Sequence, residues 1–132
     1  MKGTFLLNQK LARDGFDWGE IAWVCRPASA EAKQLAVLDV TITPTKGHEF
    51  HKHPDQEEVI YVISGSIEQW IEEKKQVLNP GDAVFIPANM VHASFALGDQ
   101  DAHLLAIMGP SVGDGGYVME DVSKEARWSG LR

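Results

Sequence analysis

Histidines and carboxylates gather in one short stretch of this 132-residue chain, where His48, His51 and His53 are followed by Glu57 and Glu58. His51 and His53 stand two positions apart, so on a β-strand both imidazoles leave the same face. Two imidazoles with one carboxylate form a ligand set that suits non-haem iron and related first-row metals. The alternative is a solvated strand edge, where a pair of glutamates at the start of a strand faces water. The stretch by itself leaves both interpretations open.

A further histidine, His92, lies in an apolar stretch between Met90 and Phe95. An imidazole buried there without a polar partner costs free energy. Either a backbone carbonyl or a bound metal would satisfy it. His92 is therefore the histidine that could complete a metal site from a later part of the chain.

Short strands are the elements that must position these side chains. Apolar and mixed positions alternate over 35–42, as in a half-buried antiparallel strand. Segment 59–63 is β-branched and aromatic, and 66–71 is expected to pair back on it as a hairpin after a turn at 64–65. The series continues with a turn at 79–82, strands at 83–86, 90–95 and 103–108, a loop at 109–116, and one or two helical turns at 28–36 and 123–128. This pattern predicts an all-β antiparallel sandwich or barrel.

Length and composition narrow the class of protein. A chain of 132 residues with 44% hydrophobic side chains is expected to form a single domain over 1–132. The net charge of −7 would repel a phosphate backbone, so we expect no nucleic-acid partner. One cysteine, Cys25, excludes a disulfide within the chain and fits a reducing compartment. With no apolar run long enough for a membrane helix, the expected location is the cytoplasm.

Two spaced motifs resemble those of the cupin superfamily. The pattern His51-x-His53-x4-Glu58-x6-Gly65 resembles the first cupin motif, and Gly81-x5-Pro87-x4-His92 resembles the second. The resemblance is to the small, single-domain, quercetinase-like cupins. It implies a double-stranded β-helix, or jelly-roll barrel, with its core at about 35–110 and flanking segments on either side. It also implies a homodimer.

The resemblance further implies that His51, His53, Glu58 and His92 bind one divalent metal inside the barrel. Glu58 is preferred to Glu57 because it keeps the six-residue distance to the motif glycine. The chain departs from the family pattern at three positions: Thr45 stands at the leading glycine, Asn89 at the glycine after the motif-two proline, and Ala96 at the terminal asparagine. None of these departures removes a ligand, and asparagine can also adopt positive φ.

Three imidazoles and one carboxylate suit Fe, Mn, Ni, Co, Cu or Zn, and are too rich in nitrogen for Ca or Mg. The first functional hypothesis is a metal-dependent, dioxygenase-like oxidoreductase that acts on an aromatic or enediol-type small molecule. In it, Glu58 also has a catalytic role as the acceptor of a substrate proton. The alternatives are a non-catalytic cupin that binds a sugar or small acid, and a metal-dependent isomerase.

The remaining histidines and aromatic residues are expected to be structural. His48 is predicted to be exposed, and His103 to face solvent or pair with Asp99 or Asp101. The aromatic residues are predicted to fill the core at Phe50, Trp70, Phe85 and Phe95, and to pack against a second subunit at Trp18, Trp23 and Trp128.

Overall fold

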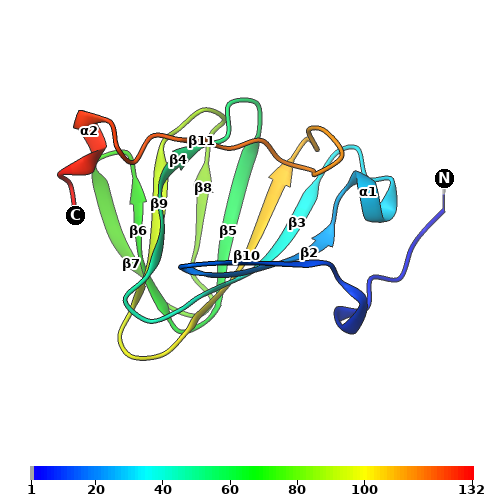
Figure 1. The fold of residues 1–132 in the computed structure, drawn as a ribbon, viewed down its shortest axis with the longest axis horizontal. Coiled ribbons are helices and arrows are strands. Elements are labelled where there is room, and N and C mark those ends of the chain that lie inside the picture. Colours follow the sequence, from blue (N-terminus) through cyan, green and yellow to red (C-terminus); the bar gives the residue numbers. More distant parts are fainter. Residues whose placement is uncertain (1) are drawn as a thin grey trace.

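Two antiparallel sheets make up the computed structural model, which describes residues 2–132. The six-stranded sheet has the order β1 (Arg13–Phe16), β2 (Gly19–Cys25), β3 (Ala36–Ile42), β10 (Ala102–Gly109), β5 (Glu57–Ser64) and β8 (Ala83–Ile86). The five-stranded sheet has the order β11 (Glu120–Asp121), β4 (Gly47–Lys52), β9 (His92–Leu97), β6 (Ser66–Ile71) and β7 (Lys74–Leu78). The short helices are η1 (Asn8–Lys10), α1 (Pro27–Ala30) and α2 (Ala126–Ser129). Figure 1 shows the sheets face to face.

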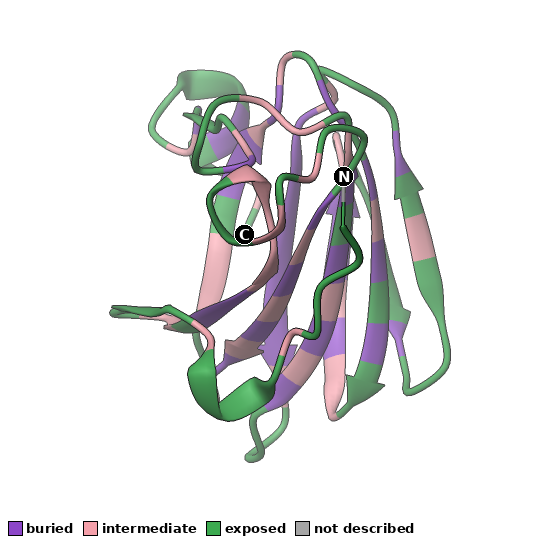
Figure 2. Ribbon diagram, turned by 90° about the vertical axis from the view of Figure 1, so that its right-hand side faces the viewer, coloured by how far each residue is buried: buried purple, intermediate pink, exposed green. Residues whose placement is uncertain are grey.

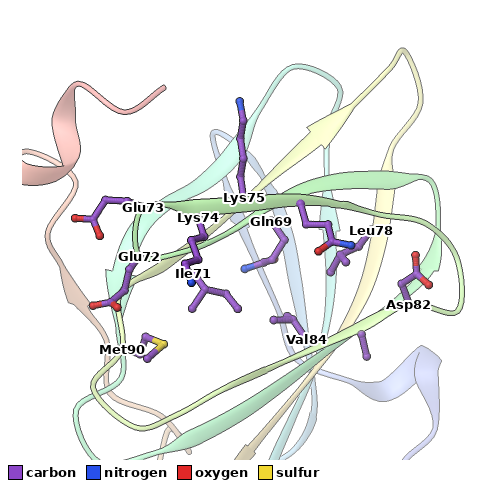
Figure 3. A pocket seen from close by; sticks show the side chains of 12 residues that line it. Gln69, Ile71, Glu72, Glu73, Lys74, Lys75, Leu78, Asp82, Val84 and Met90 are labelled. Carbon is purple, nitrogen blue, oxygen red and sulfur yellow. The ribbon is translucent and has the colours of Figure 1, made fainter.

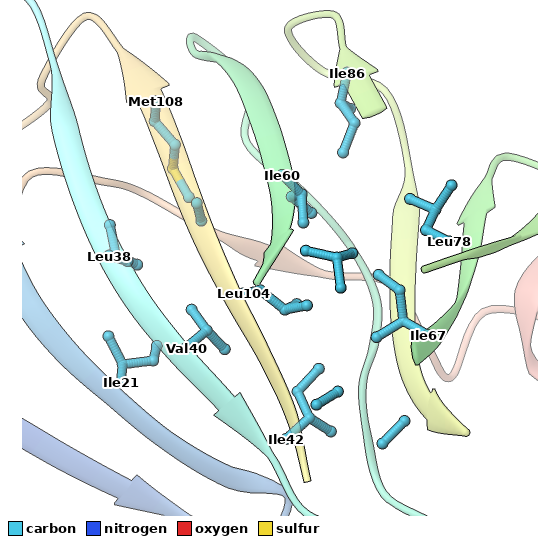
Figure 4. Packing of buried hydrophobic residues seen from close by; sticks show 14 of the residues in the cluster. Ile21, Leu38, Val40, Ile42, Ile60, Ile67, Leu78, Ile86, Leu104 and Met108 are labelled. Atoms are coloured by element: carbon cyan, nitrogen blue, oxygen red, sulfur yellow. The ribbon is translucent and has the colours of Figure 1, made fainter. Parts of the chain in front are cut away.

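The alternating sequence of β3 explains how the sheets enclose a core. Its burial alternates residue by residue from Ala36 to Ile42, as the sequence predicted. The inner face of β3 belongs to one apolar cluster together with Ile60 and Leu104 from its own sheet and Ile67 from the facing one (Figure 4). Buried residues are accordingly concentrated in the strands, while most residues of the loops are exposed or only partly buried (Figure 2). The fold is all-β and has the architecture of a jelly-roll barrel, which confirms the predicted fold class.

The predicted hairpin between 59–63 and 66–71 is wrong. β5 pairs with β10 and β8, whereas β6 pairs with β9 and β7, so the two segments belong to different sheets. Only Gly65 separates them, and one residue cannot form the two-residue loop of a tight hairpin. Gly65 has φ +70°, and a Cβ there would lie 2.4 Å from the carbonyl oxygen of Asp101. The chain therefore crosses between the sheets at this glycine.

The sequence also failed to indicate the first hairpin, β1–β2. Its first strand is exposed at every position, so it carries no apolar alternation. The indole N–H of Trp23 donates a hydrogen bond to Asp14 (2.8 Å), which ties β1 to β2. Of the predicted helical turns, 28–36 is helical only at 28–30, within α1, and ends on the first residue of β3, whereas 123–128 overlaps α2.

A second apolar cluster covers the outer side of the five-stranded sheet. It contains Phe50, Trp70, Val91, Ala93, Phe95, Val122 and Trp128. Trp128 is 4% exposed and stacks on Phe50 at 5.7 Å between ring centroids, and Trp23 is also buried. These two tryptophans therefore pack within their own chain rather than against a second subunit. Phe85, predicted to be a core residue, is 53% exposed because it lies on the outward side of edge strand β8.

The C-terminal segment, residues 110–122, crosses one end of both sheets and reaches the far edge of the five-stranded sheet (Figure 1). Gln56, 2% exposed, fixes it by donating from Nε2 to the carbonyls of Pro110 (2.7 Å) and Gly116 (2.9 Å). Its Oε1 accepts a hydrogen bond from the backbone N–H of Val118 (3.2 Å). Among residues 2–132, no helix is long and apolar enough to cross a membrane.

Candidate metal centre

Three strands and one loop bring four polar side chains together inside the barrel. His51 on β4 lies directly opposite His92 on β9 in the strand register, and directly paired residues of antiparallel strands are close neighbours. His53 follows the end of β4, and Glu58 points inward from β5 while Glu57 is exposed. We call this set, His51, His53, Glu58 and His92, the His–Glu cluster. Each member is at most 4% exposed.

The distances within the His–Glu cluster are short. One potential ligand atom from each of the three histidines lies within 4.8 Å of the other two. Oε1 of Glu58 lies 3.0 Å from Nε2 of His92 and 3.4 Å from Nε2 of His53. The four side chains therefore converge on one small volume, which is the arrangement that the sequence motifs implied.

Hydrogen bonds to the backbone fix the tautomer of all three imidazoles. Nδ1 of His51 lies 2.6 Å from the carbonyl oxygen of Glu49, Nδ1 of His53 lies 3.0 Å from that of Val118, and Nδ1 of His92 lies 3.0 Å from that of Met90. A carbonyl oxygen can only accept a hydrogen bond, so each Nδ1 carries the proton. In the neutral rings, Nε2 then keeps its free lone pair. This arrangement orients imidazoles as metal ligands.

Three atoms of the cluster have no hydrogen-bond partner among the described residues. These are Nε2 of His53, Nε2 of His92 and Oε1 of Glu58, which approach one another without hydrogen-bond alignment. Leaving a buried polar atom unpaired costs about 1–3 kcal/mol. A cation coordinated by two nitrogen lone pairs and a carboxylate oxygen would satisfy all three. The donor set therefore fits a divalent transition metal better than it fits an empty polar core.

Burial and mutual charge set the protonation of the cluster. Burial lowers the pKa of His51, and the neighbouring His48 and His92 lower it further. Burial also lowers the pKa of His53, although the charge of Glu58 acts against it. Burial opposes the net shift at the other two groups: the pKa of Glu58 is lowered by His92, and the pKa of His92 is raised by Glu58. The carboxylate is thus held ionised beside imidazoles.

His48 is not the exposed residue that the sequence predicted. It is half-buried, and its ring stacks on His51 with 3.7 Å between centroids and on Trp18 with 4.9 Å. Its Nε2 lies 3.1 Å from the sulfur of Met119. Burial, together with the charge of His92, lowers the pKa of His48 to about 4, so the ring is neutral at neutral pH.

His103 also has a different partner from those expected. It pairs with Asp39 rather than with Asp99 or Asp101, because β10 lies beside β3 and brings the two side chains together across the strands. This pair is half-exposed and lies away from the His–Glu cluster.

Sequence reasoning missed the contribution of the C-terminal segment to the centre. The carbonyl of Val118 accepts from His53, and the ring of Tyr117 lies 5.3 Å from that of His53. Burial raises the pKa of Tyr117, and the charge of Glu58 raises it further. These contacts join positions more than sixty residues apart through a loop without periodic pattern, so no local signal in the sequence could have indicated them.

A small cavity borders the His–Glu cluster. Its volume is about 30 Å³. The walls include the apolar side chains of Ile21, Leu38, Val40, Ile42, Ile60, Leu104, Ala106 and Met108. The cluster is thus a polar site at the edge of an otherwise apolar barrel interior.

An all-β barrel with inward histidines on neighbouring strands defines the class of protein. The sequence matches the model of the Cupin domain over residues 38–108, more than half of the chain. The chain belongs to the cupin family.

The chain is similar in sequence or structure to several individual proteins. It is 27% identical over 92 residues to Protein SchB of Streptomyces halstedii, a match that covers 70% of this chain and 67% of that protein. It is 31% identical over 62 residues to quercetin 2,3-dioxygenase of Bacillus subtilis, and this match covers 47% of the chain but 18% of that enzyme. Among solved structures, KdgF from Halomonas sp. superposes with a TM-score of 0.75 at 24% identity, over 86% of this chain and 98% of that one.

Proposed function

We propose that this cupin binds one divalent transition metal through His51, His53, Glu58 and His92 and acts as a metal-dependent, dioxygenase-like oxidoreductase on a small organic molecule. The observation that carries the proposal is the tautomer of the three histidines, each with Nδ1–H bound to a carbonyl, together with the unpaired Nε2 atoms of His53 and His92 beside Oε1 of Glu58. The expected metals are Fe, Mn, Ni, Co, Cu or Zn, because imidazole and carboxylate suit them all. A bound metal of this kind would supply Lewis-acid activation and, where it is redox-active, electron exchange with dioxygen.

The side chains around the metal site have separate tasks. Glu58 is ionised and buried, so its carboxylate can accept a proton from an acidic substrate group that reaches the cavity. The apolar walls, Leu38 and Leu104 among them, exclude bulk water and strengthen the charge interactions inside. The likeness to quercetin 2,3-dioxygenase supports oxidation of an organic substrate, although the chain spans only 18% of that enzyme.

Metal analysis tests the proposal directly. Wild type, His92→Ala and the control His103→Gln are purified without chelator or a nickel column, and their metal content is measured by plasma mass spectrometry. We expect near one metal per chain in wild type and in the control, and loss of the metal in His92→Ala. His103 is a suitable control because it is half-exposed and pairs with Asp39 outside the site.

The identity of the metal separates the alternative functions. Iron, manganese, cobalt, nickel or copper would direct the search to oxygen uptake. Zinc that supports turnover without oxygen would favour the isomerase. A ligand such as a sugar or small acid that raises the melting temperature and is recovered unchanged would favour the non-catalytic cupin. Absence of metal after reconstitution would exclude the enzymatic proposal.

The remaining expectations concern assembly and location. The partners are expected to be a small molecule and a second copy of the chain, with a reducing compartment, the cytoplasm, as the location. Sedimentation velocity tests the homodimer, which would have twice the 14.6 kDa mass of one chain.

A further inference from the structure

The cavity at the His–Glu cluster is too small for an organic substrate. A volume of about 30 Å³ is enough for a water-sized molecule. Pockets that bind organic ligands commonly measure about 300–1,000 Å³. Only a reacting substituent can therefore enter the cavity, and the body of the substrate must bind in an adjoining space.

A larger pocket adjoins this cavity at the tip of the β1–β2 hairpin. Its volume is about 530 Å³, and it shares three lining residues with the small cavity, namely Trp18, His48 and Tyr117. It lies between the hairpin tip, the start of β4 and the C-terminal segment. We call it the hairpin pocket.

A column of parallel rings connects the hairpin pocket to the His–Glu cluster. Phe16 stacks on Trp18 at 4.9 Å with 2° between the ring planes, and Trp18 stacks on His48 at 4.9 Å with 11°. His48 then stacks on His51 at 3.7 Å with 16°. The column begins at Phe16, which is 44% exposed, and ends at a buried candidate ligand. Met119, 38% exposed, adds a polarisable sulfur to the same pocket.

The charged residues around the hairpin pocket are either engaged elsewhere or exposed. Arg132 is paired with Glu68 (2.6 Å) and stacks on Phe95, and Asp121 accepts hydrogen bonds from Ser123. Lys46, Glu49 and Asp17 are exposed at the rim. Next to His48 itself the lining consists of Trp18, Tyr117 and the thioether of Met119, which suit a π-system.

A second large pocket, between β7 and β8, is less suited to this role. It measures about 710 Å³ but shares no lining residue with the metal cavity. A buried hydrogen bond from Ser94 to Gln69 (2.6 Å) lies between the two spaces. Charged side chains line it as they line the hairpin pocket, and include Glu72, Lys75 and Asp82 (Figure 3). The hydrogen-bonded side chains of Ser94 and Gln69 would separate a substrate held there from the His–Glu cluster.

We propose that the hairpin pocket binds a flat aromatic ring system, with Phe16, Trp18, Tyr117 and Met119 as its contact residues. An oxygen substituent of the ring passes His48 and reaches the metal cavity. This inference rests on the proposed function, because it names the substrate class and the place where the body of the substrate binds. It makes Trp18 a specificity-determining residue rather than a second-subunit contact.

Calorimetric titration with a matched pair of probes tests the inference. The probes are 2,3-dihydroxynaphthalene and its fully saturated counterpart, decahydronaphthalene-2,3-diol. Each is titrated into zinc-loaded and metal-free protein, since zinc binds the same ligands without redox turnover. In the metal-free protein, where the more acidic phenol groups gain no coordination to zinc, we expect the aromatic diol to bind more tightly than the saturated one by about three- to tenfold, the range of a single aromatic contact.

Substitutions locate the binding. Trp18→Leu keeps an apolar side chain and is expected to weaken binding of the aromatic diol by about three- to tenfold. Phe16→Ala, at an exposed ring, is the second variant in case Trp18→Leu disturbs the hairpin. Lys75→Ala, at the rim of the other pocket, is the control and should bind as wild type does. Circular dichroism and melting curves verify that each variant is folded.

The outcomes distinguish this inference from the proposed function. Wild-type affinity in both hairpin variants, or equal affinity for the saturated diol, would overturn the inference while metal binding and turnover could stand. Loss of affinity in Lys75→Ala alone would place the substrate in the other pocket and also overturn it. If zinc does not bind but the aromatic diol still binds through Trp18, the proposed function fails and the hairpin pocket remains supported.

Discussion

At the scale of single residues, Gln56 is the side chain on which most of the C-terminal segment depends. It is buried, and its amide group uses both donor and acceptor atoms on the backbone of residues 110, 116 and 118. The carbonyl of Val118 in turn orients His53. The side chain of Gln56 therefore acts on the His–Glu cluster through the loop rather than by a hydrogen bond to the cluster itself.

Replacing Gln56 with alanine is expected to lower both stability and metal affinity. The variant removes the partner of the Pro110 carbonyl and of the Val118 N–H, whereas the Gly116 carbonyl keeps the N–H of Val112 (3.1 Å), so we expect a loss of about 1–3 kcal/mol of unfolding free energy. Loss of the position of the Val118 carbonyl should weaken metal binding about 10–100-fold. Urea unfolding and metal titration measure the two effects. Gln76→Ala, at an exposed position on β7, is the control and should change neither.

Thr45 is a second residue at which a substitution should change stability, because its backbone conformation is strained. It has φ +69°, a conformation that β-branched residues adopt rarely, and it stands where the cupin motif has glycine. Asn89, at the other position where the motif glycine is replaced, has φ +66° and tolerates this conformation better. Thr45→Gly should therefore raise the unfolding free energy by about 1 kcal/mol. Thr4→Gly, in the exposed N-terminal stretch, is the control and should not raise the unfolding free energy. Chemical denaturation measures both variants, and equal effects would contradict backbone strain at Thr45.

At the scale of elements, the β1–β2 hairpin holds the ring column in place. Gly19 begins β2 with φ +152°, and a Cβ at this position would lie 1.9 Å from the carbonyl oxygen of Thr41 on β3. The carbonyl of Trp18 accepts hydrogen bonds from both the N–H and the hydroxyl of Thr43 (3.0 and 3.2 Å). The close approach of the two strands thus fixes where Trp18 lies.

A methyl group at Gly19 should separate β2 from β3. We expect Gly19→Ala to lower the unfolding free energy by about 2–4 kcal/mol, because the clash is with backbone rather than with a movable side chain. Gly15→Ala in the same hairpin has open space around its Cβ and serves as the control, with an expected change below about 1 kcal/mol. Thermal unfolding of the pair measures the difference. A Gly19→Ala variant as stable as Gly15→Ala would show that the hairpin adapts.

At the scale of the whole molecule, the His–Glu cluster links the two sheets. His51 and His92 belong to strands of the five-stranded sheet, and Glu58 belongs to the six-stranded one. A metal bound by all of them would stabilise the folded chain, since the unfolded chain has no such preformed site. Such a metal would thus have a structural effect besides a chemical one.

The melting temperature should report this effect. Zinc at about one hundred times its dissociation constant stabilises the folded state by about 2.7 kcal/mol, which corresponds to roughly 10 °C for a domain of this size. Removing the metal with a chelator should reverse the shift. His92→Ala should show little response to zinc, whereas His103→Gln should respond as wild type does. A shift of the same size in His92→Ala would place the zinc elsewhere.

The sequence predicted those parts of the structure that have a local pattern. The alternation along β3 and the spacing of the histidines and Glu58 indicated the barrel and the members of the cluster. The predicted β5–β6 hairpin was wrong because each strand joins the sheet of its distant partner: β5 pairs with β10, and β6 pairs with β9. The partner of His103, the exposure of Phe85 and the position of Tyr117 likewise follow from which strands and loops become neighbours. Such long-range relations leave no periodic signal in a single sequence.

The hairpin pocket takes only part of its lining from the stretch of the chain that holds the His–Glu cluster. All four members of the cluster fall within residues 38–108, the range that matches the Cupin domain, whereas Phe16, Trp18 and Tyr117 lie in the flanks. Substrate preference can therefore diverge by change in the flanks while the metal ligands stay as they are. For directed evolution, libraries confined to 16–18, 117 and 119 would vary the contacts to the ligand and leave Val118, whose carbonyl accepts from His53, unchanged.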